Sequence, residues 1–513
     1  MAGSCVRGMG SYDRRYKVGM VMKNPSETEP VMTVRINDAS FEYDVRSLMR
    51  AFFPHTRICF IPPADRAENF DAQQDTDLII SITEERITVI CGEEYVEKTG
   101  GGERASVKNK LKCLLYDIYA GKTGHSLPWG TLTGIRPTKL ALTRVREGAS
   151  QEEVTAFMRE KYRTSAEKAG LAYEIAKREW GIIREVPVDA YSLYVGIPFC
   201  PSICLYCSFS SYPVNRYAEK TDAYLEALFL ELEETAAIFA GRTLSSIYIG
   251  GGTPIALSAG QLQRLMSKLA ELFPTETVRE WTLEAGRADS ITQDKLLAIR
   301  SFGDIRISIN PQTFHQETLD RIGRRHTVEE VKWAFTLARE MGFSDINMDL
   351  IIGLPKETDQ EVAKTLDEVL ALRPDNLTVH SLALKRASRL REEWERFKGD
   401  TFHHSSKIMN MVALTAREMG MSPYYLYRQK DIAGNLENTG FAPEGKEGVY
   451  NILMMEDAQD IVACGAGAIS KRITGMARPV RAANVKDVDQ YIVRIREMMS
   501  RKRKLFGMPE RVV

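Results

Sequence analysis

The middle of this chain alternates short apolar runs with amphipathic stretches, and this alternation constrains the fold more than any other feature. The apolar runs predict strands at residues 192–197, 246–249, 281–284, 304–309, 345–352 and 376–382. The amphipathic stretches between them predict helices at 218–239, 258–273, 292–301, 327–341 and 359–372. Ile/Val/Leu-rich strands that alternate with helices form a parallel sheet, and right-handed crossovers roll it in one direction. The predicted fold class is therefore α/β, with a partial (β/α)6 barrel rather than a barrel of eight units.

The flanking segments have a different pattern and predict two further α+β regions. Before the barrel, the runs at 31–38, 77–83 and 86–94 predict short antiparallel strands, and 107–120 and 151–180 predict helices, the latter stretch as two. After it, 392–397, 403–420 and 488–500 predict helices, and 424–428 and 448–455 predict strands. We therefore expect an N-terminal domain of unassigned role (1–186), the barrel (187–386) and a C-terminal extension that covers the substrate (387–513).

Composition places few limits on the function but narrows the cellular setting. Lys plus Arg and Asp plus Glu both number 69, so the chain has no overall charge bias toward nucleic acid or an anionic membrane. The N-terminus lacks the apolar run of a signal peptide, and no apolar stretch is long enough to predict a membrane span. The eight Cys residues are too few for a disulfide framework. We expect a cytoplasmic protein.

Three cysteines, Cys200, Cys204 and Cys207, follow the first barrel strand with the spacing C-x3-C-x2-C. Barrel sites lie at the carboxyl ends of the strands, which is where this triad falls. Three thiolates can hold three irons of a [4Fe–4S] cluster and leave the fourth open, whereas closed electron-transfer clusters have four Cys ligands. The alternatives are buried, unrelated thiols or zinc. A structural zinc site needs a fourth ligand nearby, and no His lies between residues 186 and 303.

Further polar or flexible residues lie in the other barrel strands or in the segments that follow them. They are the run Gly250-Gly251-Gly252-Thr253-Pro254, and Glu284, Gln312, Arg324 and Asp349. The glycines allow close approach of a ligand to the backbone, the acids can accept hydrogen bonds from ribose hydroxyls or an ammonium group, and a guanidinium can hold a carboxylate. Taken singly, each also fits a tight turn, a cap, an ion pair or a solvated face. Together with an open cluster, they suit an amino acid attached to a nucleoside, as in S-adenosylmethionine.

The order of motifs gives the chain a resemblance to a known family. The motifs LYVGIPFCPSICLYC, IYIGGGTP, TLEA, RISINPQTF, IGRRHT and NMDLIIGLP occur in the order seen in the radical SAM superfamily. More narrowly, the chain resembles the oxygen-independent coproporphyrinogen III dehydrogenase family. The segments LPWGTLTGIRPTKL and NLTVHSLALKRAS resemble its HemZ-type branch.

The resemblance implies a set of cofactor residues. Cys200, Cys204 and Cys207 would ligate a [4Fe–4S] cluster. Contacts to S-adenosylmethionine would come from Tyr194, Tyr206, Gly252, Thr253, Glu284, Gln312, Arg324, Asp349 and Ala383. Within this set, Tyr206 would lie near the adenine, and Gly252 and Thr253 would bind the methionine amino group.

The resemblance also implies a reaction and its partners. A one-electron donor such as flavodoxin or ferredoxin would reduce the cluster, and S-adenosylmethionine would yield a 5′-deoxyadenosyl radical. The radical would take hydrogen from a propionate of coproporphyrinogen III, and loss of carbon dioxide and one electron would leave a vinyl group. Two such events would give protoporphyrinogen IX, a step of heme biosynthesis.

One position departs from the dehydrogenases, which carry a further Cys two residues after the third ligand. Phe209 stands there, as in a related branch of heme chaperones. The alternatives are therefore a heme carrier on the same scaffold, or a radical enzyme acting on RNA or another substrate. The RNA reading rests only on the unassigned N-terminal domain and its segment PWGTLTGIRPTK, which fits substrate docking equally well.

Several residues have two readings from sequence alone. His380 fits a core histidine or a porphyrin ligand, and the cluster Tyr424, Tyr425, Tyr427 and Arg428 fits core packing or contact with a porphyrinogen. The run Cys464–Ala468 is read as a tight turn. The basic run at 501–504 predicts a solvated tail rather than a nucleic-acid site.

Overall fold

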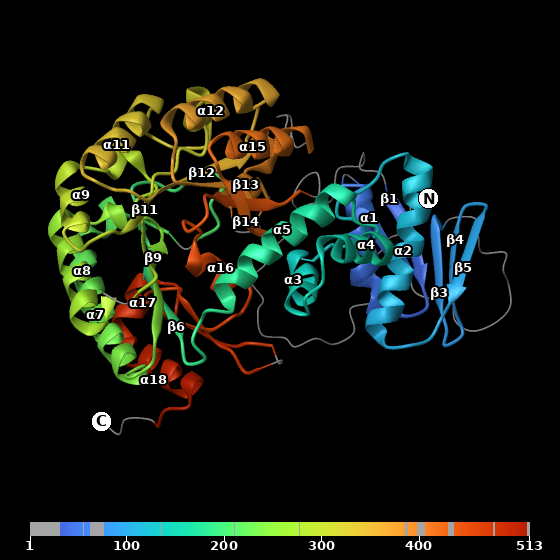
Figure 1. Cartoon of the computed structure of the whole chain (residues 1–513), viewed down its shortest axis with the longest axis horizontal. Coiled ribbons are helices and arrows are strands. Elements are labelled where there is room, and N and C mark those ends of the chain that lie inside the picture. Colours follow the sequence, from blue (N-terminus) through green and yellow to red (C-terminus); the bar gives the residue numbers. More distant parts are fainter. Residues whose placement is uncertain are drawn as a thin grey trace. The chain divides into compact units, whose positions relative to one another are not determined.

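The computed structural model describes residues 31–54, 56–61, 76–134, 136–209, 211–275, 278–383, 385, 388–397, 406–428, 436–475 and 478–509. The chain divides into two compact units, Met1–Lys110 and Leu111–Val513, which are described separately below (Figure 1). The predicted division into an N-terminal domain, a barrel and a C-terminal extension, with boundaries after residues 186 and 386, stays a prediction.

The first unit is built on a five-stranded sheet of order β2-β1-β3-β4-β5. Its elements are β1 (Val31–Ile36), α1 (Glu42–Phe52), β2 (Arg57–Ile61), β3 (Leu78–Ile82), β4 (Arg86–Cys91), β5 (Glu94–Thr99) and the start of α2 (Arg104–Thr123). The strands predicted at 31–38, 77–83 and 86–94 are β1, β3 and β4, and the prediction that they are all antiparallel is wrong for β1, which pairs in parallel with β3. The reason is that the chain leaves β1 through helix α1 and strand β2 rather than through a hairpin, and β2, which was not predicted, also pairs in parallel with β1. The pairs β3–β4 and β4–β5 are antiparallel as expected.

The second unit contains the predicted partial barrel. Six parallel strands lie side by side in chain order: β6 (Tyr191–Ile197), β9 (Leu244–Gly251), β10 (Glu280–Glu284), β11 (Arg306–Ser308), β12 (Ile346–Ile352) and β13 (Asn376–Ser381). Their crossover helices form an arc outside the strands (Figure 1): α7 (Thr221–Ile238), α8 (Ala259–Leu272), α9 (Gln293–Arg300), α11 (Val328–Glu340) and α12 (Asp359–Leu372). The α/β fold class and the six-unit barrel are confirmed.

Local sequence explains why these elements form where they do. Ser258, Thr327 and Thr358 each begin a helix with a reciprocal capping box, which satisfies backbone N–H groups that would otherwise lack partners. Along the strands, outward side chains such as Leu193 and Ile247 are fully buried in the core shared with the helices. The alternate side chains point into the barrel and are polar or aromatic. The barrel interior is therefore lined mainly by polar and aromatic side chains, which can contact a polar ligand.

Elements from the C-terminal third extend the barrel sheet at both edges. β14 (Ser422–Tyr427) and β15 (Asn438–Ala442) add antiparallel strands beside β13. At the other edge β16 (Asp460–Cys464) pairs in parallel with β6, followed by β17 (Ile469–Arg472) and β18 (Val480–Ala483). Helices α13 (Arg389–Glu392), α14 (Trp394–Phe397), α15 (Ser406–Glu418), α17 (Val488–Val493) and α18 (Ile495–Phe506) complete the region.

The strand predicted at 448–455 is wrong: residues Val449–Met455 form helix α16. Short apolar runs are ambiguous between strand and helix. The buried residues here, Val449, Tyr450, Ile452 and Leu453, follow the three-to-four-residue spacing of a helix face rather than strand alternation.

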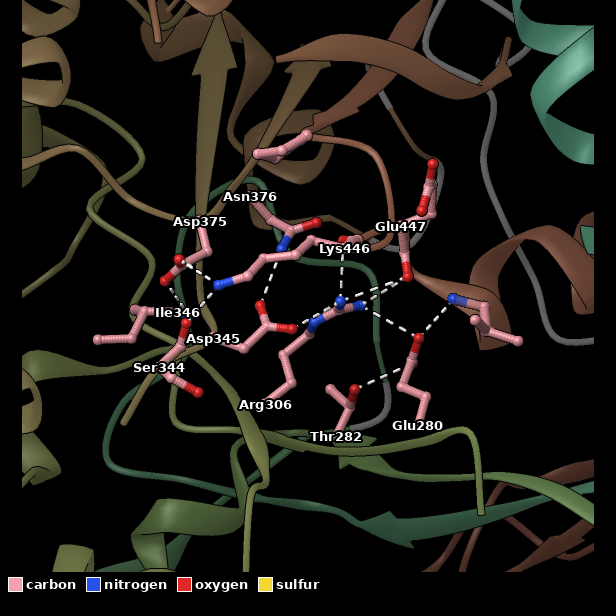
Figure 2. Close-up of polar contacts among 12 residues, drawn as sticks. Glu280, Thr282, Arg306, Ser344, Asp345, Ile346, Asp375, Asn376, Lys446 and Glu447 are labelled. Atoms are coloured by element: carbon pink, nitrogen blue, oxygen red, sulfur yellow. Dashed lines mark hydrogen bonds and ion pairs between the residues drawn. The ribbon is translucent and has the colours of Figure 1, made fainter. Parts of the chain in front are cut away.

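A buried ionic network lies at the amino-terminal ends of strands β10, β11 and β12 and contacts the first turn of α16 (Figure 2). The Arg306 guanidinium contacts the Glu280 carboxylate at 3.1 Å and the Asp345 carboxylate at 2.8 Å, and donates to the Lys446 carbonyl at 2.9 Å. Glu280 also accepts from the Val449 backbone N–H at the first turn of α16. Arg306 and Glu280 are both buried, so each depends on the other for charge compensation.

Three helices of the same unit, α3 (Thr138–Arg146), α4 (Gln151–Tyr162) and α5 (Ala166–Ile183), share a core with β14 and α16. Trp129, from the segment resembling the HemZ-type branch, is fully buried and its indole N–H donates to Glu437 at 2.8 Å. This part of the segment therefore has a packing role. Across the described residues, no helix has the length and apolar character needed to cross a membrane.

Candidate functional site

The cysteine triad lies on the loop that leaves the carboxyl end of β6. Cys200 ends the short strand β7 (Phe199–Cys200), Cys204 is buried, and the Cys207 N–H donates to the Cys204 carbonyl at 3.2 Å. Among the described residues, no three His, Cys, Asp or Glu side chains are arranged to hold a single metal ion. A [4Fe–4S] cluster has a different requirement, because each Cys thiolate binds its own iron.

Two buried arginines hold this loop from other parts of the barrel. Arg287, on the loop after β10, donates to the Ser202 carbonyl at 3.1 Å and lies 3.7 Å from the Cys204 sulfur. Arg324 donates to the Tyr206 hydroxyl at 3.3 Å and to the Asn310 carbonyl at 2.6 Å. The cluster loop is therefore tied to the loops that follow two other strands.

Burial dominates the acidity of Cys200 and Cys207. It raises the pKa of the Cys200 thiol to about 12, with Cys207 and Cys204 adding to the rise and Arg287 and Arg324 opposing it. Burial also raises the pKa of Cys207. Metal binding needs thiolates, so iron would have to displace protons from these sulfurs.

The glycine run after β9 lies against the start of the cluster loop. The Gly252 N–H donates to the Ile197 carbonyl and the Thr253 N–H to the Phe199 carbonyl, both at 2.8 Å. A Cβ at Gly252 would lie 2.5 Å from the Phe199 carbonyl oxygen, so only glycine fits. The loop with Gly252 and Thr253, predicted to bind the methionine amino group, is thus held directly beside the triad.

Glu284 ends β10 inside the barrel, next to a stack of tyrosines. The Tyr248 hydroxyl donates to Glu284, and the Tyr248 ring stacks on Tyr450 of α16 with centroids 4.5 Å apart and on Tyr194 with centroids 6.2 Å apart. Burial raises the pKa of Glu284 to about 7; the Tyr248 hydrogen bond lowers it and nearby Asp349 raises it. This carboxyl group therefore changes charge near neutral pH.

Two buried amides at the same barrel end have oxygen atoms without a hydrogen-bond partner in the protein. They are Asn310 Oδ1 and Gln312 Oε1, on the loop after β11. Gln312 also has a positive φ of 66°, held because its N–H donates to the Asp349 carbonyl and its carbonyl accepts from Ile351, each at 2.9 Å. Strain and unsatisfied buried polar atoms cluster at ligand sites. The residues present fit a polar cofactor such as S-adenosylmethionine.

The remaining predicted contacts lie at the same barrel end. Asp349, on β12, accepts from the Asn347 side chain at 2.8 Å and lies 3.9 Å from the His380 imidazole. Ala383 is buried just beyond β13. The predicted role of Arg324 in holding a carboxylate stays a prediction. Its Nη atoms are engaged by the protein, whereas its buried Nε has no protein partner.

The structure also places Phe209 and the histidine and tyrosines for which the sequence allowed two interpretations. The Phe209 side chain is 68% exposed, and the Lys385 ammonium lies 5.5 Å from its ring centre. The His380 Nδ1 lies 3.2 Å from the Tyr427 hydroxyl. Tyr424 and Tyr425 belong to the core with α5, which favours packing for both.

Three residues of the site escaped the sequence analysis: Arg287, Tyr248 and Asn310. Tyr248 and Asn310 lie within motifs used for the resemblance, two residues from Gly250 and Gln312, and inward alternation along β9 was the available signal for Tyr248. Arg287 is a lone arginine with no spacing relation to the cysteines.

Comparison with known proteins agrees with this geometry. The model of the radical SAM superfamily matches residues 194–369. The oxygen-independent coproporphyrinogen-III oxidase-like protein HemZ of Bacillus subtilis is 38% identical over 449 residues, covering 82% of this chain and 89% of that protein. The heme chaperone HemW of the same bacterium is 31% identical over 310 residues, covering 60% and 76%.

A solved structure shows the same relationship. The coproporphyrinogen III oxidase HemN of Escherichia coli, described as a radical SAM enzyme, aligns with a TM-score of 0.50 and 28% identity over 62% of this chain and 72% of that one. Fold, motif order and overall similarity agree. The chain belongs to the radical SAM superfamily, in the HemZ-like branch of the oxygen-independent coproporphyrinogen III oxidase family, and its cofactors are a [4Fe–4S] cluster and S-adenosylmethionine.

Proposed function

We propose that this protein converts coproporphyrinogen III to protoporphyrinogen IX by oxygen-independent oxidative decarboxylation. The observation that carries the proposal is the meeting of three features at one barrel end. These are the cysteine triad, the buried carboxyl group of Glu284, and the unpartnered amide oxygens of Asn310 and Gln312. The names of the relatives HemZ and HemN support the choice of substrate.

The proposed residues divide the work between holding iron and holding S-adenosylmethionine. Cys200, Cys204 and Cys207 would hold the cluster, which together with S-adenosylmethionine supplies one-electron cleavage and hydrogen abstraction when bound. The backbone of Gly252 and Thr253 would face the methionine amino group. Buried Glu284 and Asp349 would accept hydrogen bonds, and the surrounding tyrosines would exclude water.

The proposed chemistry balances for each propionate side chain. S-adenosylmethionine, when bound, would supply the group that takes one hydrogen atom from the carbon next to the ring, and that hydrogen ends in 5′-deoxyadenosine. Carbon dioxide and one electron would leave next, and a vinyl group would remain. Two such events give the product. A one-electron donor, for which we propose a flavodoxin or ferredoxin, supplies each cleavage, and a one-electron acceptor takes the electron released.

An anaerobic turnover assay tests the proposal. Reconstituted protein, S-adenosylmethionine, a strong reductant and coproporphyrinogen III are mixed, and products are followed by mass spectrometry. We expect protoporphyrinogen IX to form, with two molecules of 5′-deoxyadenosine for each one.

A matched variant identifies the source of the activity. Cys204→Ala should lose the cluster absorbance and both products. The substitution Cys91→Ala, in the first unit and outside the triad, should keep them. Formation of 5′-deoxyadenosine without any change in the porphyrinogen would contradict the substrate assignment and leave the radical chemistry standing.

A second candidate function is a heme carrier, favoured by the exposed Phe209 and by the similarity to the heme chaperone HemW. This reading predicts stoichiometric binding of heme, measured by its Soret band, and no vinyl product. Heme binding that accompanies full turnover would argue against a carrier-only role.

A further inference from the structure

We propose that Arg287 is a positioning residue that sets the reduction potential of the iron–sulfur cluster through the Cys204 sulfur. This inference rests on the cluster ligands of the proposed function. It is independent of the substrate, because it concerns only the electron that enters the cluster.

The contacts of Arg287 place a fixed positive charge at the cluster loop. One Nη lies 3.7 Å from the Cys204 sulfur, within hydrogen-bond range for sulfur, and donates to the Ser202 carbonyl at 3.1 Å. The other Nη donates to the Ser202 hydroxyl at 2.9 Å and pairs with Asp289 at 2.6 Å. The residue is 3% exposed, so water screens this charge little.

The contacts also orient the guanidinium. Arg287 Nε also donates to the Asp289 carboxylate, at 3.1 Å. The guanidinium therefore donates two hydrogen bonds to one carboxylate, and these fix its plane. The Ser202 hydroxyl contacts the Gly323 carbonyl at 3.3 Å, which joins the same point to the segment before α11. Arg287 therefore has little freedom to turn away from the sulfur.

A cation in this place favours the reduced cluster. Reduction adds one negative charge to the cluster, and a buried positive charge and an N–H donor at a ligand sulfur both stabilise that added charge. Two other cations also act on the triad, by charge alone. Arg324 opposes the rise in the pKa of Cys200, and Lys385 opposes the rise in the pKa of Cys207. Across the described residues, Arg287 is the only cation that hydrogen-bonds a triad sulfur.

The test is a redox titration followed by electron paramagnetic resonance on the full-length, reconstituted protein without S-adenosylmethionine. Arg287→Met keeps much of the side-chain volume and removes the charge and donor. We expect at least a tenfold fall in the equilibrium constant for reduction, which is a shift of about 59 mV to lower potential. Asp289→Asn removes the neighbouring negative charge and should shift the potential upward.

Two further variants separate this role from general damage. Arg287→Lys keeps the charge and should restore a large part of the potential lost in Arg287→Met. Arg300, the last residue of α9, pairs with Asp304 on the outer side of the barrel strands; Arg300→Gln removes that positive charge and should leave the potential unchanged.

The outcomes that overturn the proposal are specific. A loaded Arg287→Met protein with the wild-type potential would do so. If Arg287→Met fails to assemble the cluster, Asp289→Asn decides alone, and an unchanged or lowered potential there overturns it. Failure of the turnover assay leaves this titration unaffected, because the titration needs only the cluster.

Discussion

At the scale of single residues, the raised pKa of Glu284 predicts that cofactor binding depends on pH. Burial raises its pKa to about 7, so in the free protein this group is partly protonated at neutral pH. An ionised carboxylate is the better acceptor for an ammonium group or a ribose hydroxyl. Affinity for S-adenosylmethionine should therefore rise with pH up to about 7 and level off above it, falling by about tenfold per pH unit well below the pKa.

Anaerobic isothermal titration calorimetry on both sides of pH 7 measures this dependence. In Glu284→Gln the affinity should be lower and the rise centred near pH 7 should vanish. In Tyr248→Phe the midpoint should move to higher pH, because the hydroxyl that lowers the pKa of Glu284 is lost. The same pH dependence in Glu284→Gln as in the wild type would assign the titration to another group.

The cysteines and Arg287 mark the limits of prediction at this scale. The triad was predictable because its three members lie within one loop, so their spacing alone records a shared ligand. Arg287 contacts Cys204 from 83 residues away. A contact of that kind arises only when the strands align, and a single sequence contains no local pattern that reports it.

At the scale of elements, α16 depends on a buried charge. Glu280 accepts from the Arg306 guanidinium, the Thr282 hydroxyl and the first turn of α16. Removing it as Glu280→Ala leaves a buried cation without one of its partners and a helix N–H unsatisfied. We expect a loss of about 3–5 kcal/mol in the free energy of unfolding, measured by urea denaturation.

Matched variants test whether the loss comes from the unpaired charge. The exposed pair of Arg300 with Asp304 should cost at most about 1 kcal/mol when broken by Asp304→Asn. The double variant Glu280→Met/Arg306→Met removes both charges and should lose less stability than Glu280→Ala. A double variant less stable than the single one would contradict this account.

Elements were predictable where their boundaries are chemical. Helix α12 has the predicted bounds, 359–372, because Thr358 forms a capping box and Arg373 ends the helix in a left-handed conformation. Strand β16 was not predicted because its five residues, DIVAC, show too little alternation of polar and apolar side chains. Strand β15 was not predicted because it contains Gly440, and glycine is uncommon inside strands. The helix α16 was mistaken for a strand because a short apolar run fits either period until its packing partners, Tyr248 and Tyr194, are known.

At the scale of the whole molecule, the division of the chain separates cofactor chemistry from the first unit. All proposed cofactor residues lie between 194 and 383, within the second unit, and the first unit has its own sheet and core. A protein of residues 103–513 keeps helix α2 whole and begins after Gly101 and Gly102, whose positive φ values mark a turn. We expect this shortened protein to keep the iron content and the affinity for S-adenosylmethionine of the full chain, measured by iron analysis and anaerobic calorimetry.

The control is the content of helix and strand by circular dichroism, which shows that the shortened protein is folded. A folded protein that no longer binds S-adenosylmethionine would mean that the first unit helps to build the cofactor site. With binding intact, its turnover of coproporphyrinogen III becomes informative. Loss of turnover alone would assign the first unit to the substrate or to the electron donor, because every residue proposed to hold the cluster and S-adenosylmethionine would still be in place.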